Sequence, residues 1–281
     1  MASNQHQRYA KAMMTWGQGY ALFHPASDVH DQAKPGVCGY IDDSGLWQSI
    51  IDLNDKAALK QAGLAGPGVT VLKPAYFETW GPKYTDTVTE SKAKAEAGVA
   101  AGIPVDFSTL LEYRATSGFA AVLLCGDAVK LTTYPHKDPF RRWAKDNAQR
   151  ILQMCGDVAK HGFYVMTTTW SAQDIHINAW ANRANSVTIG VKGSVPQAGT
   201  VSGSVQYHRG GAVGGWHQHK AVGDERRVLF FGGLYFKFRR LRKSFREVAQ
   251  EKWNGTLGDD EGGIFLVENG GEAYEVESHV I

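Results

Sequence analysis

Hydrophobic and polar residues alternate over long parts of this chain, and a period of two indicates strands with one buried face. The plainest examples lie between residues 162 and 208. The alternating sets are Ile175, Ile177 and Ala179, then Val187, Ile189 and Val191, then Val201, Gly203, Val205 and Tyr207. A second strand-rich stretch covers residues 69–125 and ends in the apolar run 119–125. Because these sets follow one another in neighbouring pairs, we expect antiparallel hairpins.

Further apolar segments extend the predicted sheet. Residues 36–41 and 47–53 flank the turn sequence 42–45, which favours a hairpin. Residues 163–170 and 228–236 are rich in valine, threonine and aromatic residues, which are common in strands.

Apolar residues spaced three or four positions apart predict the helices. The first spans residues 4–16 and ends at Gly17. Its predicted buried face consists of Tyr9, Met13 and Trp16. The clearest helix begins at Asp138, which suits the N-cap, with Pro139 at its first position. Asn54 is the expected cap of a short helix over residues 55–61.

These elements predict an α+β fold, in which helices pack on a long, twisted, mainly antiparallel sheet. A short C-terminal helix and tail follow. A chain of 281 residues is long enough to bury a sizeable core, as one large domain or two small ones.

The C-terminal region joins two parts of opposite charge. Residues 237–248, KFRRLRKSFREV, have the apolar spacing of an amphipathic helix with a basic outer face. From residue 251 onward, eight acidic residues accompany a single base, so residues 251–281 carry −7 while the whole chain carries +2. A basic amphipathic helix beside an acidic tail indicates a membrane-binding surface with its own cover. A solvated helix followed by a frayed terminus fits the same pattern.

Composition indicates the cellular compartment in which the chain folds. The hydrophobic content of 43% is ordinary for a globular protein, and the apolar runs are too short to cross a bilayer as helices. The N-terminus lacks the apolar core of a signal peptide. Three widely spaced cysteines do not predict a disulfide framework. We therefore expect a cytoplasmic, reducing environment.

Motifs for catalysis are largely missing from the sequence. It contains no phosphate-binding glycine loop, dinucleotide fingerprint, zinc-protease motif or nucleophile elbow. His217 and His219 have the spacing of two ligands on one strand face, but loop histidines are commoner. His176 beside Asp174 resembles an acid–base pair, although an outward polar position in a strand explains it more simply. We expect neither enzymatic activity nor a cofactor, metal or nucleic-acid partner.

Several segments resemble the gasdermin family. Residues 161–208 resemble the second insertion hairpin region of gasdermins, and residues 226–241, RRVLFFGGLYFKFRRL, resemble the strand that closes their pore-forming domain. Trp47, followed by the pair 52–53, stands where family members carry a tryptophan and then Asp-Leu. The size and the short tail are similar to the fungal branch, the heterokaryon-incompatibility and regulator-of-cell-death gasdermins. The resemblance covers most of residues 5–245.

The resemblance implies a pore-forming executor of regulated, lytic cell death. It implies a pore-forming domain with the gasdermin fold over residues 1–238 and an autoinhibitory segment over residues 239–281. Cleavage by a subtilisin-like serine protease, or an incompatible allelic partner, would activate the chain. The active form would move from the cytoplasm to the plasma membrane and bind acidic phospholipids. There it would assemble into a ring and insert two hairpins per subunit as a β-barrel.

Animal gasdermins differ, because they carry a large helical repressor domain. In this chain only residues 239–281 follow Phe238. Masking of the pore-forming domain would therefore depend on the short helix and the acidic tail.

Candidate site residues follow from the resemblance and from charge. The lipid-binding candidates are Arg8, Lys11, Arg141, Arg142, Lys145 and Lys237. Arg8 and Lys11 match lipid-binding bases of the family, whereas those of residues 141–145 are assigned from charge alone. Cleavage is expected in an exposed linker between Phe238 and Arg239, with Phe245 as second choice, because subtilisin-type pockets favour large apolar residues. A cut there raises the retained charge from +2 to +5, which favours anionic membranes.

Three other interpretations stay open at this stage. The alternating segments could form ordinary sheet that never inserts. The chain could be a lipid- or partner-binding module activated by an allelic partner rather than by cleavage. An enzyme of unknown class would use Cys125, Cys155 or the loop 216–219, but no assembled catalytic motif supports it.

Overall fold

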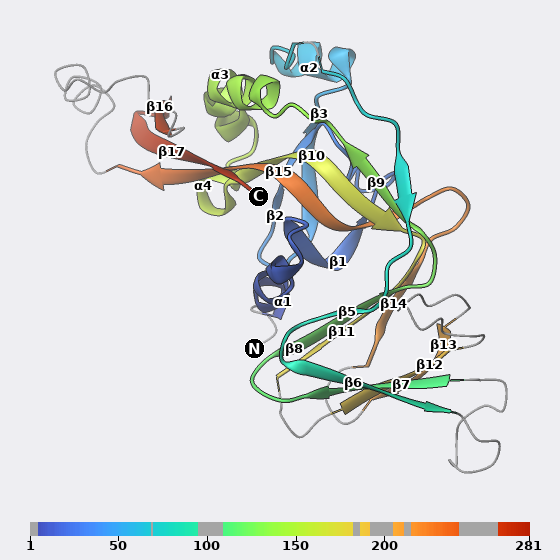
Figure 1. Cartoon of the computed structure of the whole chain (residues 1–281). Helices are drawn as coiled ribbons and strands as arrows, with labels where there is room; N and C mark the ends of the chain where they lie inside the picture. The colour runs from blue at the N-terminus through green and yellow to red at the C-terminus, as the bar shows by residue number, and fades with distance from the viewer. Residues whose placement is uncertain are drawn as a thin grey trace. The chain divides into compact units, whose positions relative to one another are not determined.

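The fold, taken from a computed structural model, is α+β with antiparallel strand pairing, as the sequence predicts. The structure describes residues 5–68, 70–94, 109–181, 186–191, 205–210, 215–241 and 264–281. The chain divides into two compact units, each made of separate stretches of sequence (Figure 1). Unit 1 comprises Met1–Val29, Ala75–Leu131 and Trp170–Phe230, and unit 2 comprises His30–Pro74, Thr132–Thr169 and Phe231–Ile281.

Unit 1 contains two four-stranded sheets, the N-terminal helix, and the strands β1 and β4, which belong to neither of these sheets. Its helical elements are α1 (Gln5–Met13) and the 3-10 turn η2 (Met14–Trp16). Its strands are β1 (Tyr20–Ser27), β4 (Tyr76–Glu78), β5 (Lys83–Tyr84), β6 (Val88–Lys94), β7 (Thr109–Ala115), β8 (Ala120–Cys125), β11 (Asp174–Trp180), β12 (Ser186–Val191), β13 (Val205–Gly210) and β14 (His217–Lys220). One sheet has the order β14-β11-β8-β5, and we call it the support sheet. The other has the order β13-β12-β7-β6, and we call it the hairpin sheet.

The predicted N-terminal helix is present and anchors one face of the support sheet. α1 packs on β1 and β8. Tyr9 and Met13 are fully buried, among residues of β8 and β11 such as Leu123 and Ile177. Gly17 ends the helical segment in the left-handed conformation, at φ 68°, which glycine adopts without strain. The prediction for Trp16 is wrong, because this side chain is 37% exposed rather than buried with Tyr9.

Unit 2 consists of one sheet covered by helices. Its elements are β2 (Val37–Ile41), β3 (Trp47–Asp52), α2 (Lys56–Ala62), α3 (Asp138–Met154), α4 (Val158–His161), β16 (Ile264–Asn269) and β17 (Glu272–Val280). Three strands contribute residues to both units, namely β9 (Val129–Thr133), β10 (Phe163–Ala172) and β15 (Arg227–Arg240). The sheet order is β16-β17-β15-β10-β2-β3. The predicted β2–β3 hairpin is confirmed, with Ile41 opposite Trp47 across its turn.

The core of unit 2 lies between α3 and this sheet. The apolar stripe of α3 buries Phe140, Trp143 and Ile151, which join Phe163 and Phe236 of the strands. The rings of Phe163 and Phe236 stack with centroids 4.7 Å apart. Offset aromatic pairs of this kind add to the stabilisation that burial provides.

Two predicted helix caps are displaced by one residue. Asp55, not Asn54, caps α2, since its side chain accepts hydrogen bonds from the backbone N–H groups of Ala57 and Ala58. Asn54 instead accepts a hydrogen bond from the Tyr134 hydroxyl at 2.7 Å. Asp138 is the first residue of α3 rather than its cap, and it forms an ion pair with Arg141 at 2.8 Å. Asn54 and Asp55 are adjacent and both residue types suit a cap, so the sequence leaves the cap of α2 ambiguous.

The largest correction concerns the C-terminal region. Residues 237–240, predicted to begin an amphipathic helix, continue strand β15 to Arg240. The acidic tail is not frayed at its end, because β16 and β17 form an antiparallel hairpin whose second strand pairs with β15. Residues 242–263, which include the rest of the predicted helix, lie outside the described residues. The strand-rich stretch predicted from residue 69 begins later than expected, since the described residues 70–72 are not in a strand.

The C-terminal hairpin belongs to the core of unit 2. Val267, Tyr274 and Val276 are buried in the same apolar cluster as Phe238 and Leu152. The predicted division at residue 238 therefore does not coincide with a division between compact units, because residues 231–281 belong to one of them.

The contribution of the C-terminal hairpin to stability can be measured with two valines of β17. Val276 is fully buried and Val280 is 59% exposed. We expect Val276→Ala to lower the free energy of unfolding by about 2 kcal/mol, because a buried valine loses its apolar contacts. Val280→Ala should change it by less than about 0.5 kcal/mol. Urea denaturation measures both, and equal small effects would contradict an integral hairpin.

Candidate functional site

Two β-hairpins that are distant in sequence lie side by side in the hairpin sheet. β6 pairs with β7 and β12 pairs with β13, and all the pairings are antiparallel. β7 also pairs with β12, from Arg114 opposite Ser186 to Thr109 opposite Val191 (Figure 1). The predicted hairpin in the second half is confirmed by β12 and β13. Residues 163–170 and 175–179 are also neighbouring predicted strands, for which the same reasoning predicts a hairpin. That prediction is wrong, because β11 pairs with β8 and β14.

The hairpin sheet has one apolar face and one polar face. Its buried apolar side chains are Val88, Leu111, Tyr113, Ala115, Val187 and Ile189. They pack with the support-sheet residues Ala120, Val122, Leu124 and Trp180, and with Trp216. The intervening residues Thr89, Ser91 and Arg114 are exposed. This alternation places a largely apolar layer between the hairpin sheet and the support sheet.

A polar network occupies the outer face of the hairpin sheet. The Glu112 carboxylate accepts a hydrogen bond from Arg114 at 3.3 Å, and Ser91 of β6 lies directly opposite it. A hydrogen bond from Ser186 lowers the pKa of Glu112 against the opposing effect of partial burial, and Arg114 and Ser91 lower it further. The network links three of the four strands, so the two hairpins share polar as well as backbone contacts.

The exposed face of α1 carries the first pair of predicted lipid-binding residues. Arg8 and Lys11 are both exposed, and the Arg8 guanidinium lies 4.5 Å from the centroid of the Phe119 ring. Met14 follows on η2 with 62% of its surface exposed. Two bases are therefore followed closely in the sequence by two exposed apolar side chains, Met14 and Trp16. Neither of these was among the lipid-binding candidates predicted from the sequence.

Lys83 is a further residue that the sequence analysis missed. Its ammonium group lies 4.1 Å from the centroid of the Trp16 ring and 4.2 Å from that of Trp80. Burial lowers the pKa of Lys83, and Glu78 partly opposes this. The lysine therefore joins η2 to the support sheet through cation–π contacts. Lys83 lies two residues before a polar, threonine-rich stretch, and no pattern in the surrounding sequence predicts its contacts with the two tryptophans.

The other predicted bases lie on unit 2. Arg142 and Lys145 are exposed on α3, whereas Arg141 forms the ion pair with Asp138. Lys237 is exposed on β15, directly opposite Glu277 of β17. The structure brings together the members of each helix group but assigns α1 and α3 to different units.

The predicted cleavage position is not in an exposed linker. Phe238 is 7% exposed and pairs with Val276 in the middle of a sheet. Arg239 is opposite Glu275, and Arg240 forms an ion pair with Glu272. A protease needs an extended, accessible segment, which a paired and buried strand does not offer. The second choice, Phe245, lies outside the described residues.

The histidines adopt positions that differ from those expected. His176 is completely buried, with its Nε2 atom 3.1 Å from the Asp174 carboxylate, so its prediction as an outward residue is wrong. His217 is exposed, and burial lowers the pKa of His219 to about 4. Across the part of the chain that the structure describes, no group of three or more histidine, cysteine or acidic residues could hold a metal ion.

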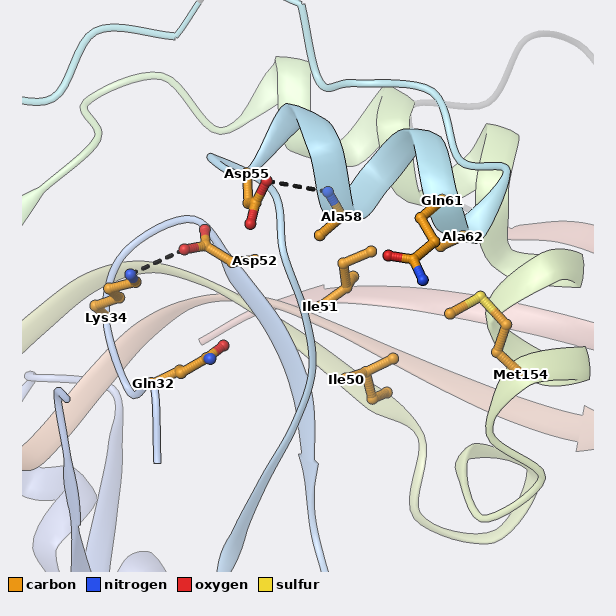
Figure 2. Close-up of a pocket in the computed structure, with 10 residues that line it drawn as sticks. All are labelled: Gln32, Lys34, Ile50, Ile51, Asp52, Asp55, Ala58, Gln61, Ala62 and Met154. Carbon is orange, nitrogen blue, oxygen red and sulfur yellow. Dashed lines mark hydrogen bonds and ion pairs between the residues drawn. The ribbon is translucent and has the colours of Figure 1, made fainter. Parts of the chain in front are cut away.

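A hollow of about 490 Å³ lies beside α2 in unit 2. Figure 2 shows Lys34 and Asp52 joined by an ion pair on one side of it and Met154 on the other. The Asp55 carboxylate is already engaged in capping α2. The lining includes none of the predicted lipid-binding or cleavage residues.

Neither models of known protein families nor curated proteins give a match to this chain. None of the described helices combines the length and the hydrophobicity that crossing a membrane requires.

The outer network predicts a pH dependence. A carboxyl group whose pKa is lowered on folding contributes stability above its ordinary pKa of 4.5, and this is lost as the pH falls through the lower folded value. We expect Glu112→Gln to reduce the loss of stability over this acidic range. Ser186→Ala, which removes the first donor, should act in the same direction. Denaturation curves between pH 7 and pH 3 measure the effect, and profiles identical to that of the unaltered chain would refute it.

Proposed function

We propose that this chain is a gasdermin-like pore-forming protein that executes lytic cell death, with the fold of the gasdermin pore-forming domain. In this proposal it rests in the cytoplasm and acts at the plasma membrane. It binds acidic phospholipids, assembles with further copies into a ring, and inserts its two hairpins as part of a β-barrel. The fungal heterokaryon-incompatibility gasdermins are the branch that it resembles.

The observation that carries this proposal is the amphipathic hairpin sheet. An inserted β-strand needs an apolar face toward lipid and a polar face toward the water-filled lumen. β7 and β12 have this alternation, β6 adds Val88 to the same apolar face, and the support sheet now covers that face. The pairing of β7 with β12 already aligns both hairpins in one antiparallel arrangement. Insertion would therefore exchange one apolar environment for another without breaking this pairing.

The N-terminal helix supports binding to an anionic surface. Arg8 and Lys11 supply charge, and the exposed Met14 and Trp16 supply apolar and aromatic contacts at the lipid interface. In our proposal this face of α1 makes first contact. The α3 bases Arg142 and Lys145 and the strand residue Lys237 are secondary contacts.

The C-terminal hairpin is the proposed inhibitory segment. Glu277 and Glu275 of β17 lie opposite Lys237 and Arg239, so carboxylates occupy positions beside the bases of β15. Because Phe238 is buried in this pairing, we now place the activating cut among residues 242–263, between β15 and β16. The cutting enzyme would be a subtilisin-like serine protease, and an incompatible allelic partner is the alternative trigger.

A second candidate is a lipid- or partner-binding module that never inserts. One observation favours it, because Val276 and Tyr274 of the C-terminal hairpin are buried in the core of unit 2. A cut in the chain alone leaves these contacts in place. An allelic partner that competes for β15 would then be the more effective trigger.

Leakage of dye from vesicles separates the two candidates. The full chain is given a site for a sequence-specific protease within residues 242–263 and is tested before and after cutting. Pore formation predicts dye release only from the cut chain and only from vesicles with acidic phospholipid, because the cut allows the C-terminal hairpin to leave β15 and its bases to bind the membrane. Zwitterionic vesicles are the control.

Two results would count against pore formation. Binding of the cut chain to acidic vesicles without dye release favours the non-inserting module. Equal release from the cut and uncut chains removes the inhibitory role of the C-terminal hairpin.

Charge reversal on α1 tests the membrane contact. Each base near an anionic leaflet contributes about 1 kcal/mol, so Arg8→Glu with Lys11→Glu should weaken binding of the cut chain by roughly tenfold or more. Lys56→Glu with Lys60→Glu, on the exposed face of α2, changes the net charge equally and is the matched control. Vesicle sedimentation measures both. Equal weakening by the two pairs would show that net charge, rather than α1, governs binding.

A further inference from the structure

The interface between the hairpin sheet and the support sheet contains two buried polar residues. On β11, Ile175 and Ile177 face the cluster beneath α1, so the alternating residues His176 and Asn178 lie on the opposite face. That face also carries Leu124 and Val122, their direct partners on β8, and the hairpin sheet covers it. His176 is 0% exposed and Asn178 is 1% exposed. Unit 1 therefore places two polar side chains inside an otherwise apolar layer.

The polar partners in this interface lie within each sheet. The Asp174 carboxylate, which is 3.1 Å from His176, belongs to the same strand of the support sheet. Burial raises the pKa of the Tyr113 hydroxyl, and Glu90, directly opposite it within the hairpin sheet, raises it further. Both pairs can remain intact if the two sheets separate. Separation would then expose chiefly apolar surface to water.

Asn178 differs from these pairs. Its Nδ2 atom is buried, and none of the described groups accepts a hydrogen bond from it. A buried amide without a partner is unfavourable relative to the same amide in water. Separation of the sheets would restore that hydration. The apolar layer thus favours the closed arrangement, while Asn178 favours the open one.

We propose that Asn178 is a release residue, a buried amide that keeps the hairpin sheet separable from the support sheet. The effect of Asn178 on the stability of the interface does not depend on the proposed function. Its role in releasing the hairpins rests on the proposed pore formation. An apolar residue at position 178 would hold the hairpin sheet closed more firmly. The other face of the support sheet, with Cys125 in the cluster beneath α1, would be unaffected.

Cysteine labelling of the full chain, without membranes, tests this inference. Val187→Cys places a thiol on β12 at a site that is 1% exposed in the interface. When reclosing is fast, the labelling rate of a buried thiol reports how often its surroundings open. We expect Asn178→Leu to slow labelling at position 187 by roughly tenfold. Removing a buried amide that lacks a hydrogen-bond partner should stabilise the closed interface by the corresponding factor in the opening equilibrium. Native Cys125 serves as internal control, and its rate should not change.

Two further variants keep the test decisive. Asn178→Val fits a strand and replaces the leucine variant if that chain does not fold. Asn147→Leu is the matched control, because this buried asparagine on α3 is fully engaged, donating to the Trp143 carbonyl and accepting from the Ala65 N–H. It should not slow labelling at position 187. Unchanged or faster labelling at position 187 in folded Asn178→Leu and Asn178→Val chains overturns the proposal.

A vesicle experiment separates this inference from the proposed function. The cut chain is compared with its Asn178→Leu variant on vesicles containing acidic phospholipid, with dye release as readout. Slower labelling together with slower dye release supports both proposals. Slower labelling with no release from either chain supports the release residue and overturns pore formation. Dye release with unchanged labelling overturns the release residue and leaves pore formation standing.

Discussion

The antiparallel pairing of β7 with β12 is the interaction on which the candidate site depends. It joins residues 109–115 to residues 186–191, which are separated by β8, β9, β10, β11 and the longest helix. Without it, each hairpin would be a two-stranded ribbon, and such ribbons are marginally stable in water. Together β6, β7 and β12 supply the apolar side chains that pack on the support sheet. The same pairing therefore accounts for the stability of the hairpin sheet and for its two-faced character, which the proposed insertion requires.

Alternating charges align β15 with β17 in unit 2. Residues 236–239 of β15 alternate buried aromatic residues with bases, and residues 274–277 of β17 alternate buried apolar residues with acids. When the two strands pair, the bases meet the acids on one face and the apolar residues meet on the other. Exposed pairs of this kind contribute little stability individually, but they fix which residues are opposite one another. The buried face supplies most of the binding energy, so any activation must overcome apolar contacts as well as charge.

The candidate site was accessible to sequence reasoning only in part. Alternation identified β12, a continuous apolar run identified β8, and β7 fell within the strand-rich stretch 69–125, because these patterns depend on local burial. Alternation could not say that β7 would pair with β12, since strand partners are chosen by long-range contacts. It also misjudged His176, because a polar residue at an alternate position is ordinarily solvated. A second sheet covers that position here, and no local pattern records it.

The sequence by itself determined the elements whose signals are local: the amphipathic stripe of α3, the turn between β2 and β3, and the glycine that ends the first helical segment. It also determined the separation of basic and acidic charge along the chain. Only the tertiary structure decided the conformation of residues 237–240, where Phe236 and Phe238 fit a period of two as well as Phe238 and Leu241 fit a helical period. β17 resolves that ambiguity, because it offers a complete row of backbone partners and opposite charges that a helix would leave unused.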